Sequence, residues 1–266
     1  MHCGPGELAR CRYCGVTVRR EQMPASYDTD KYDLAMLDVL YPRYRRAFAR
    51  RARRYFPLLS AGAEVLEIGC HTGAFLEVAE CCGWRPTGLD IGEDTSRYAA
   101  RRGLHVIRNT LHEARLAGAF AEALFIWNCF EQMEDPLGTL REAHRFLRDD
   151  ALLIVRVPNL AFYERQRRRR AYLALVHQNL LGFPYQLGYT PATLSAVLRS
   201  GGFEIVSGHD CNLLISPFPE LTQDVKRERR TLQVDERARP PERLSGPWIE
   251  LVGRRRREGR GKTYVY

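Results

Sequence analysis

The chain has 266 residues, of which 45% are hydrophobic and 27% charged, and this composition predicts a folded domain with a large core. The formal net charge of +9 comes from arginine, because only Lys31, Lys226 and Lys262 are lysines. No apolar run reaches the roughly 18 residues that a membrane-spanning helix needs, and the chain does not begin with the apolar core of a signal peptide. We therefore expect a soluble, cytoplasmic protein without a membrane partner.

The first 26 residues carry three of the eight cysteines, two of them in Cys11-Arg12-Tyr13-Cys14-Gly15. Two thiolates at this spacing can bind one metal ion, and the glycine that follows permits a tight turn. A structural zinc site needs four ligands, and Cys3 and His2 are the candidates to complete the set. The segment predicts either a degenerate zinc knuckle, with Cys3, Cys11 and Cys14 as metal ligands, or a loose tail with incidental thiols.

Residues 27–60 predict a helical cap. Leu34, Leu37 and Leu40 recur at helical spacing, and we expect one helix over 32–40 and another over 43–59. The two are separated at Pro42, because proline lacks the N–H group that continues a helix.

The stretch from Val65 to Gly73 predicts a buried strand, a glycine turn and the start of a helix. A second strand ends at Asp90, 23 residues beyond Glu67, where a carboxylate can accept hydrogen bonds from a ribose. This is the layout of a nucleotide-type cofactor site. The dinucleotide fingerprint G-x-G-x-x-G does not fit, because His71 stands where its second glycine must approach a pyrophosphate. A cofactor without phosphates fits better.

Strands and helices alternate from residue 63 onward, which predicts an α/β fold with a parallel sheet and helices on both faces. Ligands of such sheets bind at the carboxyl ends of the strands. Glu67, Asp90, Asn109 and Asn128 stand at or just after such ends. The expected strands are 64–68, 85–90, 104–107, 123–128, 151–157 and 203–208, and the expected helices are 73–82, 94–102, 137–147 and 191–200.

The segment Glu67-Ile68-Gly69-Cys70-His71-Thr72-Gly73 resembles the E-x-G-x-G-x-G motif of class I S-adenosylmethionine-dependent methyltransferases, with His71 in place of the middle glycine. Three later stretches resemble the same family in the same order: 127–136 with its E-x-x-x-D-P pattern, 152–159 ending in Pro-Asn, and 189–203 with its Y-x-T and G-F elements. Residues 128–136 are most similar to the ubiquinone-type O-methyltransferases. The resemblance implies a Rossmann-like sheet with an antiparallel last strand.

The resemblance also implies S-adenosylmethionine as the cofactor and assigns roles by position. Glycine-turn residues meet its methionine part, Asp90 holds the ribose, and the segment after the third strand meets the adenine. The implied cofactor-binding residues are Glu67, Gly69, Cys70, Gly73, Asp90, Ile91, Asn109, Thr110, Leu111 and Asn128.

Methyl transfer needs alignment of the acceptor and exclusion of water, and an oxygen acceptor often needs a base as well. The family's histidine beside the glutamate is Gln132 in this chain, and an amide cannot take a proton. Glu131 and His177 remain as candidate bases, so the candidate catalytic residues are Glu131, Gln132 and His177. A pre-ionised acceptor would need no base.

The domain organisation follows from these motifs. Residues 1–26 form a cysteine-bearing appendage, 27–60 the helical cap, and 61–210 the methyltransferase core, with a substrate lid at 158–190. Residues 211–266 form an arginine-rich insertion, and Thr263–Tyr266 suits the last strand.

Three functions are compatible with the sequence. The favoured one is methyl transfer to a small-molecule acceptor, through an oxygen, in specialised or glycan metabolism. The runs Arg50–Arg54, Arg165–Arg170 and Arg254–Arg257 leave a nucleic-acid or protein methyltransferase as an alternative, although such runs are also typical of solvated helix faces. The third is a methyltransferase-like binding or scaffold protein without activity, suggested by His71, Gln132 and the glutamine at 186.

Overall fold

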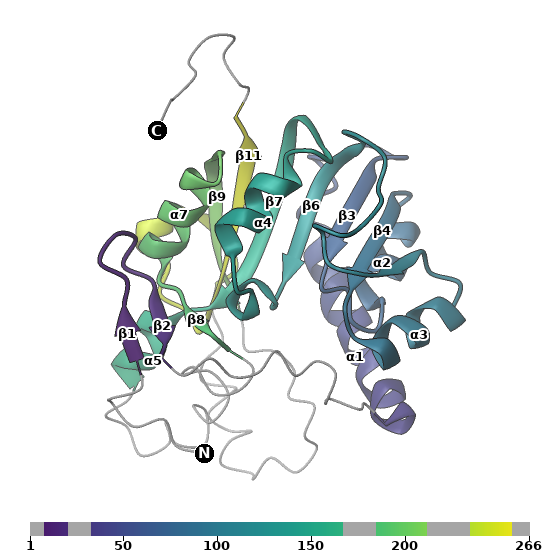
Figure 1. Ribbon diagram of the computed structural model, residues 1–266, viewed down its shortest axis with the longest axis horizontal. Coiled ribbons are helices and arrows are strands. Elements are labelled where there is room, and N and C mark those ends of the chain that lie inside the picture. The colour runs from purple at the N-terminus through teal and green to yellow at the C-terminus, as the bar shows by residue number, and fades with distance from the viewer. Residues whose placement is uncertain (1–7, 21–32, 167–184, 212–234, 257–266) are drawn as a thin grey trace.

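The computed structural model describes residues 8–20, 33–166, 185–211 and 235–256. Within them, eight strands form one sheet in the order β10-β9-β11-β7-β6-β3-β4-β5 (Figure 1). Strands β5, β4, β3, β6 and β7 run parallel, whereas β11 is antiparallel to both β7 and β9. The family resemblance implied one antiparallel strand of this kind, although at other residues. The bounds are β3 Glu64–Ile68, β4 Arg85–Asp90, β5 Val106–Arg108, β6 Ala121–Trp127, β7 Leu147–Pro158, β9 Phe203–Cys211, β10 Ala238–Arg239 and β11 Trp248–Arg255.

Helices cover both faces of this sheet, as Figure 1 shows. One face packs against α1 (Leu34–Ala52) and α2 (Ala74–Cys81), with α3 (Glu93–Arg101) beside them. The other face packs against α4 (Pro136–Ala143) and α7 (Pro191–Ser200). The short helices are η2 (Phe130–Gln132), α5 (Leu160–Gln166) and η3 (Pro241–Arg243). None of the described helices is both long and apolar enough to cross a membrane.

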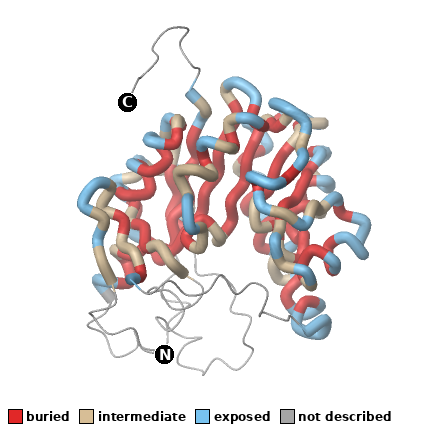
Figure 2. Tube along the Cα trace, in the orientation of Figure 1, coloured by how far each residue is buried: buried red, intermediate tan, exposed pale blue. Residues whose placement is uncertain are grey.

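The strands are apolar on both faces because helices cover both. In β6, Leu124 and Ile126 join the core under α4 and α7, whereas Phe125 and Trp127 join the core under α1 and α2. Figure 2 shows the result as a continuous buried band through the sheet and the inward sides of the helices.

Strands β3, β6 and β7 pair in parallel, so their carboxyl ends meet at one edge of the sheet, which is the lower edge in Figure 1.

Two expectations about the elements were wrong. Pro42 does not separate two helices, because α1 continues through it from Leu34 to Ala52. The missing backbone hydrogen bond costs up to about 3 kcal/mol, and burial of Tyr41 and Phe48 on either side of the proline offsets it. The antiparallel strand is Trp248–Arg255, inside the segment interpreted as a polar insertion. Residues 263–266, predicted to form it, lie outside the described residues.

The N-terminal segment is docked on the domain. Strands β1 (Leu8–Arg10) and β2 (Thr17–Arg19) form an antiparallel hairpin, and β2 pairs in turn with β8 (Leu187–Gly188). This second, three-stranded sheet lies at the edge where the strands of the main sheet end (Figure 1).

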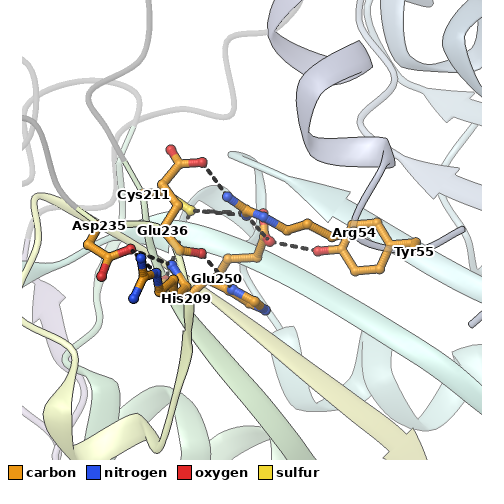
Figure 3. Close-up of polar contacts among 8 residues, drawn as sticks. Arg54, Tyr55, His209, Cys211, Asp235, Glu236 and Glu250 are labelled. Atoms are coloured by element: carbon orange, nitrogen blue, oxygen red, sulfur yellow. Dashed lines mark hydrogen bonds and ion pairs between the residues drawn. The ribbon is translucent and has the colours of Figure 1, made fainter. Parts of the chain in front are cut away.

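A buried ion network ties the segment after α1 to the antiparallel strands (Figure 3). Arg54 Nη1 lies 2.8 Å from Glu250 Oε1 on β11, and its Nη2 pairs with Glu236. Tyr55 donates a 2.6 Å hydrogen bond to the same Glu250 oxygen. Burial would raise the pKa of Glu250, but Arg54 and Tyr55 hold it below its ordinary value. Arg54 thus turns inward, and Arg51 is buried too, so the Arg50–Arg54 run is not a uniform solvated surface.

Removing the cation of this network should destabilise the fold. In an Arg54→Met variant the buried Glu250 carboxylate loses its ion pair, and the free energy of unfolding should fall by roughly 3 kcal/mol, as when one partner of a buried pair is removed. Urea unfolding followed by circular dichroism measures this change. Arg53→Met is the matched control, because Arg53 is exposed and should change stability by less than about 0.5 kcal/mol. Equal losses in the two variants would contradict a role for the network.

Candidate functional site

The turn after β3 has the conformation that its glycines predict. Gly69 and Gly73 have φ angles of 75° and 73°, in the left-handed region that glycine adopts without strain. A Cβ atom on Gly69 would also lie 2.6 Å from the Cys129 sulfur, so no larger residue fits there. The amides of Gly69 and Cys70 donate to the Leu89 carbonyl at 2.8 and 3.0 Å, which fixes the turn to the end of β4.

His71 occupies the same region of backbone conformation, with φ at 49°. Histidine is one of the few residues besides glycine that is enriched there. Its ring lies edge-on to Tyr44 of α1, with ring centroids 6.0 Å apart. Burial lowers the pKa of His71, against the opposing effect of Asp90. The ring is thus part of the packing between the turn and α1, rather than a freely solvated turn residue.

The Asp90 carboxylate joins the two loops that follow β3 and β4. Its Oδ2 accepts a 2.7 Å hydrogen bond from the His71 amide. Its Oδ1 accepts from the Gly92 amide at 2.9 Å and from the Thr95 hydroxyl at 2.8 Å. A carboxylate has about four acceptor positions, so Asp90 can also accept hydrogen bonds from a ligand.

Glu67 lies beneath this turn and is 2% exposed. Its Oε2 has no hydrogen-bond partner among the described residues. Burial, with a smaller effect from Asp90, raises the pKa of Glu67 well above its usual range. An unsatisfied carboxyl at this position fits a bound amino group.

The positions predicted to meet adenine follow β4 and β5. Ile91 is 41% exposed directly after Asp90, which leaves an aliphatic surface beside the carboxylate. Asn109 Oδ1 accepts a hydrogen bond from the Thr110 amide, and the Leu111 side chain is buried. Asn109 and Thr110 therefore shape the loop after β5, while Ile91 presents its side chain to solvent.

Comparison with known proteins decides the family. A family model described as a methyltransferase domain matches residues 41–208, more than half of the chain. The chain belongs to this family. No curated protein matches it significantly. Three solved methyltransferase structures are similar to it, at identities that show the fold alone.

The first is a SAM-dependent methyltransferase from Archaeoglobus fulgidus, with TM-score 0.58 and 19% identity, covering 84% of this chain and 100% of that one. The plantazolicin methyltransferase BpumL, solved in complex with SAH, has TM-score 0.54 and 16% identity, with 87% and 93% of the two chains covered. Geranyl diphosphate C-methyltransferase from Streptomyces coelicolor has TM-score 0.58 and 11% identity, with 88% and 89% covered. The Rossmann-like methyltransferase fold predicted from the sequence is confirmed.

In this methyltransferase domain, Asn128 and Gln132 form the turn after β6. Asn128 has φ at 57°, and its Oδ1 accepts a hydrogen bond from Arg156. Gln132 Nε2 donates to the Asn128 carbonyl at 2.9 Å. The Gln132 side chain therefore stabilises the turn, and its predicted place among the catalytic residues stays a prediction.

Glu131 is the most unusual group near the strand ends. It is fully buried, and neither carboxyl oxygen has a hydrogen-bond partner among the described residues. Burial raises the pKa of Glu131 to about 8, although its own backbone amide and Arg156 lower it. Tyr185 and Tyr189 are close enough to interact with it electrostatically. A carboxyl held in this way can accept a proton near neutral pH.

Sequence reasoning overlooked Arg156. Its side chain is fully buried, with the guanidinium 4.3 Å from the centre of the Trp248 ring. Burial, together with Arg51, lowers the pKa of Arg156 to about 10. The signal was present as one charged residue inside the otherwise apolar run 151–158. Such a residue in a buried strand indicates a buried ionic contact or a site.

The remaining predicted residues are only partly described. Cys11 and Cys14 stand at the tip of the N-terminal hairpin, but the described residues contain no cluster of three or more metal-binding side chains. The described residues alone therefore do not fit zinc, and the zinc prediction depends on Cys3, outside the described residues. His177 lies outside them as well.

The backbone conformation at residue 71 predicts which replacements are tolerated. His71→Asn should keep the turn, because asparagine adopts the left-handed region readily. His71→Val should lower the free energy of unfolding by about 1–2 kcal/mol more, because a branched Cβ clashes there. Chemical denaturation of the two variants measures the difference, and equal stabilities would show that the turn relaxes to another conformation.

Proposed function

We propose that this chain transfers a methyl group from S-adenosylmethionine to an oxygen of a small-molecule acceptor, with Glu131 taking the proton. The observation that carries the proposal is the buried Glu131 carboxyl in η2, two residues after Cys129, whose sulfur donates to the Ile68 carbonyl at the end of β3. Its raised pKa matches the operating range of a general base.

The residues present fit the cofactor. Asp90 would hold the ribose hydroxyls, Ile91 would cover the adenine, and the unsatisfied Glu67 oxygen would accept from the amino group. When bound, S-adenosylmethionine supplies a methyl group on a sulfonium, which is already activated for displacement. A cation at this position also lowers the pKa of a nearby carboxyl, which favours ionised Glu131 when the cofactor is present.

For transfer of the methyl group to the acceptor oxygen, the protein needs to position the acceptor and to take up its proton. Glu131 receives the hydroxyl proton as the acceptor oxygen forms its bond to the methyl carbon and the carbon–sulfur bond breaks. The carboxyl is fully buried, and Tyr185, Tyr189 and Arg156 interact with it electrostatically. The product is a methyl ether or ester together with S-adenosylhomocysteine, and the proton remains on Glu131 until the site opens.

Cofactor binding is tested by calorimetric titration with S-adenosylhomocysteine. The wild type should bind, and Asp90→Ala should bind at least 100-fold more weakly, because it loses both the ribose acceptor and the hydrogen bond that holds the His71 amide. Asp94→Ala is the matched control at the start of α3 and should bind within about twofold of the wild type. If the wild type does not bind S-adenosylhomocysteine, the third function given above, a methyltransferase-like binding or scaffold protein without activity, becomes the better interpretation.

The role of Glu131 is tested with phenolic acceptors of graded acidity and radiolabelled S-adenosylmethionine. Glu131 works as a base only when ionised, so the wild-type rate should rise with pH through the pKa of this carboxyl, which is about 8 without the cofactor and lower when the cofactor is bound. Glu131→Gln should abolish this rise and lower the rate by 100-fold or more for weakly acidic phenols. The loss should shrink for phenols that are already ionised at the assay pH. A constant loss across the series would exclude proton transfer to Glu131.

A further inference from the structure

The N-terminal hairpin lies outside the matched methyltransferase domain at 41–208, and it closes on itself through its own hydrogen bonds. The Cys11 amide donates to the Val16 carbonyl at 2.8 Å, and the Gly15 amide donates to the Cys11 carbonyl at 3.0 Å. Gly15 has φ at 72°, which permits the tight tip. The hairpin is therefore one hydrogen-bonded unit where it docks on the domain.

Its docking surface is the core beside the candidate base. Val16 is 4% exposed and belongs to the same core cluster as Phe130 and Tyr189. These two aromatic rings stack with centroids 5.5 Å apart. Cys14 packs against this cluster as well. The hairpin thus joins the hydrophobic core that contains Phe130, the residue before Glu131 in the chain.

A short path of backbone hydrogen bonds joins the hairpin to Glu131. The Arg19 amide at the end of β2 donates to the Gln186 carbonyl at 3.0 Å. The Gln186 amide in turn donates to the Glu131 carbonyl at 2.9 Å. The backbone of Gln186 is therefore hydrogen-bonded to the hairpin through its carbonyl and to Glu131 through its amide.

We propose that the N-terminal hairpin is a positioning element of the acceptor side of the site, acting through Gln186 on Glu131. This inference rests on the proposed function, which assigns Glu131 its catalytic role; the contacts of the hairpin do not depend on that role. Strand β8 consists of just Leu187–Gly188, and ordering each backbone residue costs about 1–2 kcal/mol. A strand as short as β8 makes too few contacts of its own to offset this cost, and its pairing with β2 adds hydrogen bonds that hold it in place.

The consequence for Glu131 is the exclusion of water. The charged and titratable groups around it are Arg156 from β7, Cys129 before it in the chain, and Tyr185 and Tyr189 on either side of β8. Two of these four groups, Tyr185 and Tyr189, lie in the segment around β8 that pairs with the hairpin. If the hairpin no longer pairs with this segment, water reaches the Glu131 carboxyl, and the pKa of that carboxyl returns toward its ordinary value of 4.5.

The test compares two substitutions at one position in the full-length protein. Arg19→Pro removes the single N–H group that donates to Gln186, whereas Arg19→Ala removes the same side chain and keeps that N–H. The readout is the Glu131 carboxyl pKa, measured by NMR titration of protein carrying carboxyl-labelled glutamate, with Glu131→Gln to assign the signal. We expect a value near 8 for the wild type. Both variants lack the buried Arg19 side chain, so the value for Arg19→Pro should be at least one pH unit below that for Arg19→Ala.

A second pair covers the case in which Arg19→Pro does not fold. Val16→Ala weakens hairpin docking, and Val206→Ala is its control, because Val206 is 53% exposed on β9. Only Val16→Ala should lower the Glu131 pKa. An unchanged pKa in both Arg19→Pro and Val16→Ala would overturn the inference.

Failure of the proposed function has a different signature from failure of this inference. Titration with S-adenosylhomocysteine should give the same affinity, within about twofold, for all four variants, because the hairpin pairs with β8, whereas Asp90 bonds the loops after β3 and β4. No binding by the wild type would refute the proposed function while leaving the NMR result standing. Normal binding with an unmoved Glu131 pKa would refute the positioning role alone.

Discussion

The Asp90 carboxylate is the constraint on which the candidate site depends. Parallel pairing places Ile68 of β3 opposite Leu89 of β4, so the loops after these strands begin side by side. Asp90 then bonds the His71 amide in one loop and the Gly92 amide and Thr95 hydroxyl in the other. One carboxylate thus holds a turn in which Gly69, His71 and Gly73 have positive φ angles. A carboxylate also favours the start of α3, because helix N-termini stabilise negative charge.

Buried charge defines the second half of the site and the adjoining sheet. Glu131, Arg156 and Glu250 are all fully buried, but their environments differ in kind. Glu250 is matched by Arg54 and Tyr55 and keeps a lowered pKa. Glu131 accepts no such hydrogen bond from the described residues, and its pKa is raised. The first arrangement stabilises a tertiary contact, whereas the second leaves a buried carboxyl without compensating hydrogen bonds from the described residues, which costs stability. Groups with this contrast are often functional.

The N-terminal hairpin shows how an element outside the family domain modifies it. The domain provides the sheet and the cofactor turn, while β1 and β2 complete a small second sheet over the end of β7 and the turn at Glu131. The contacts are backbone hydrogen bonds together with the side chains of Val16 and Arg19, which are buried, and of Cys14. The backbone hydrogen bonds depend on position and conformation more than on side-chain identity, and for this reason they leave little trace in the sequence.

The sequence by itself determined the strands β3, β4, β6 and β7, the helices α2, α3 and α7, and the cofactor turn, because apolar periodicity and glycine positions are local properties. It also placed Asp90, since parallel strands end at a common edge. Only the tertiary structure decided that α1 runs through Pro42, that β11 takes the antiparallel place, and that His71 packs on Tyr44. The same holds for the docked hairpin and for the burial of Glu131 and Arg156. Each of these depends on contacts between segments distant in the chain, whose free energies outweigh local preference and cannot be read from neighbouring residues.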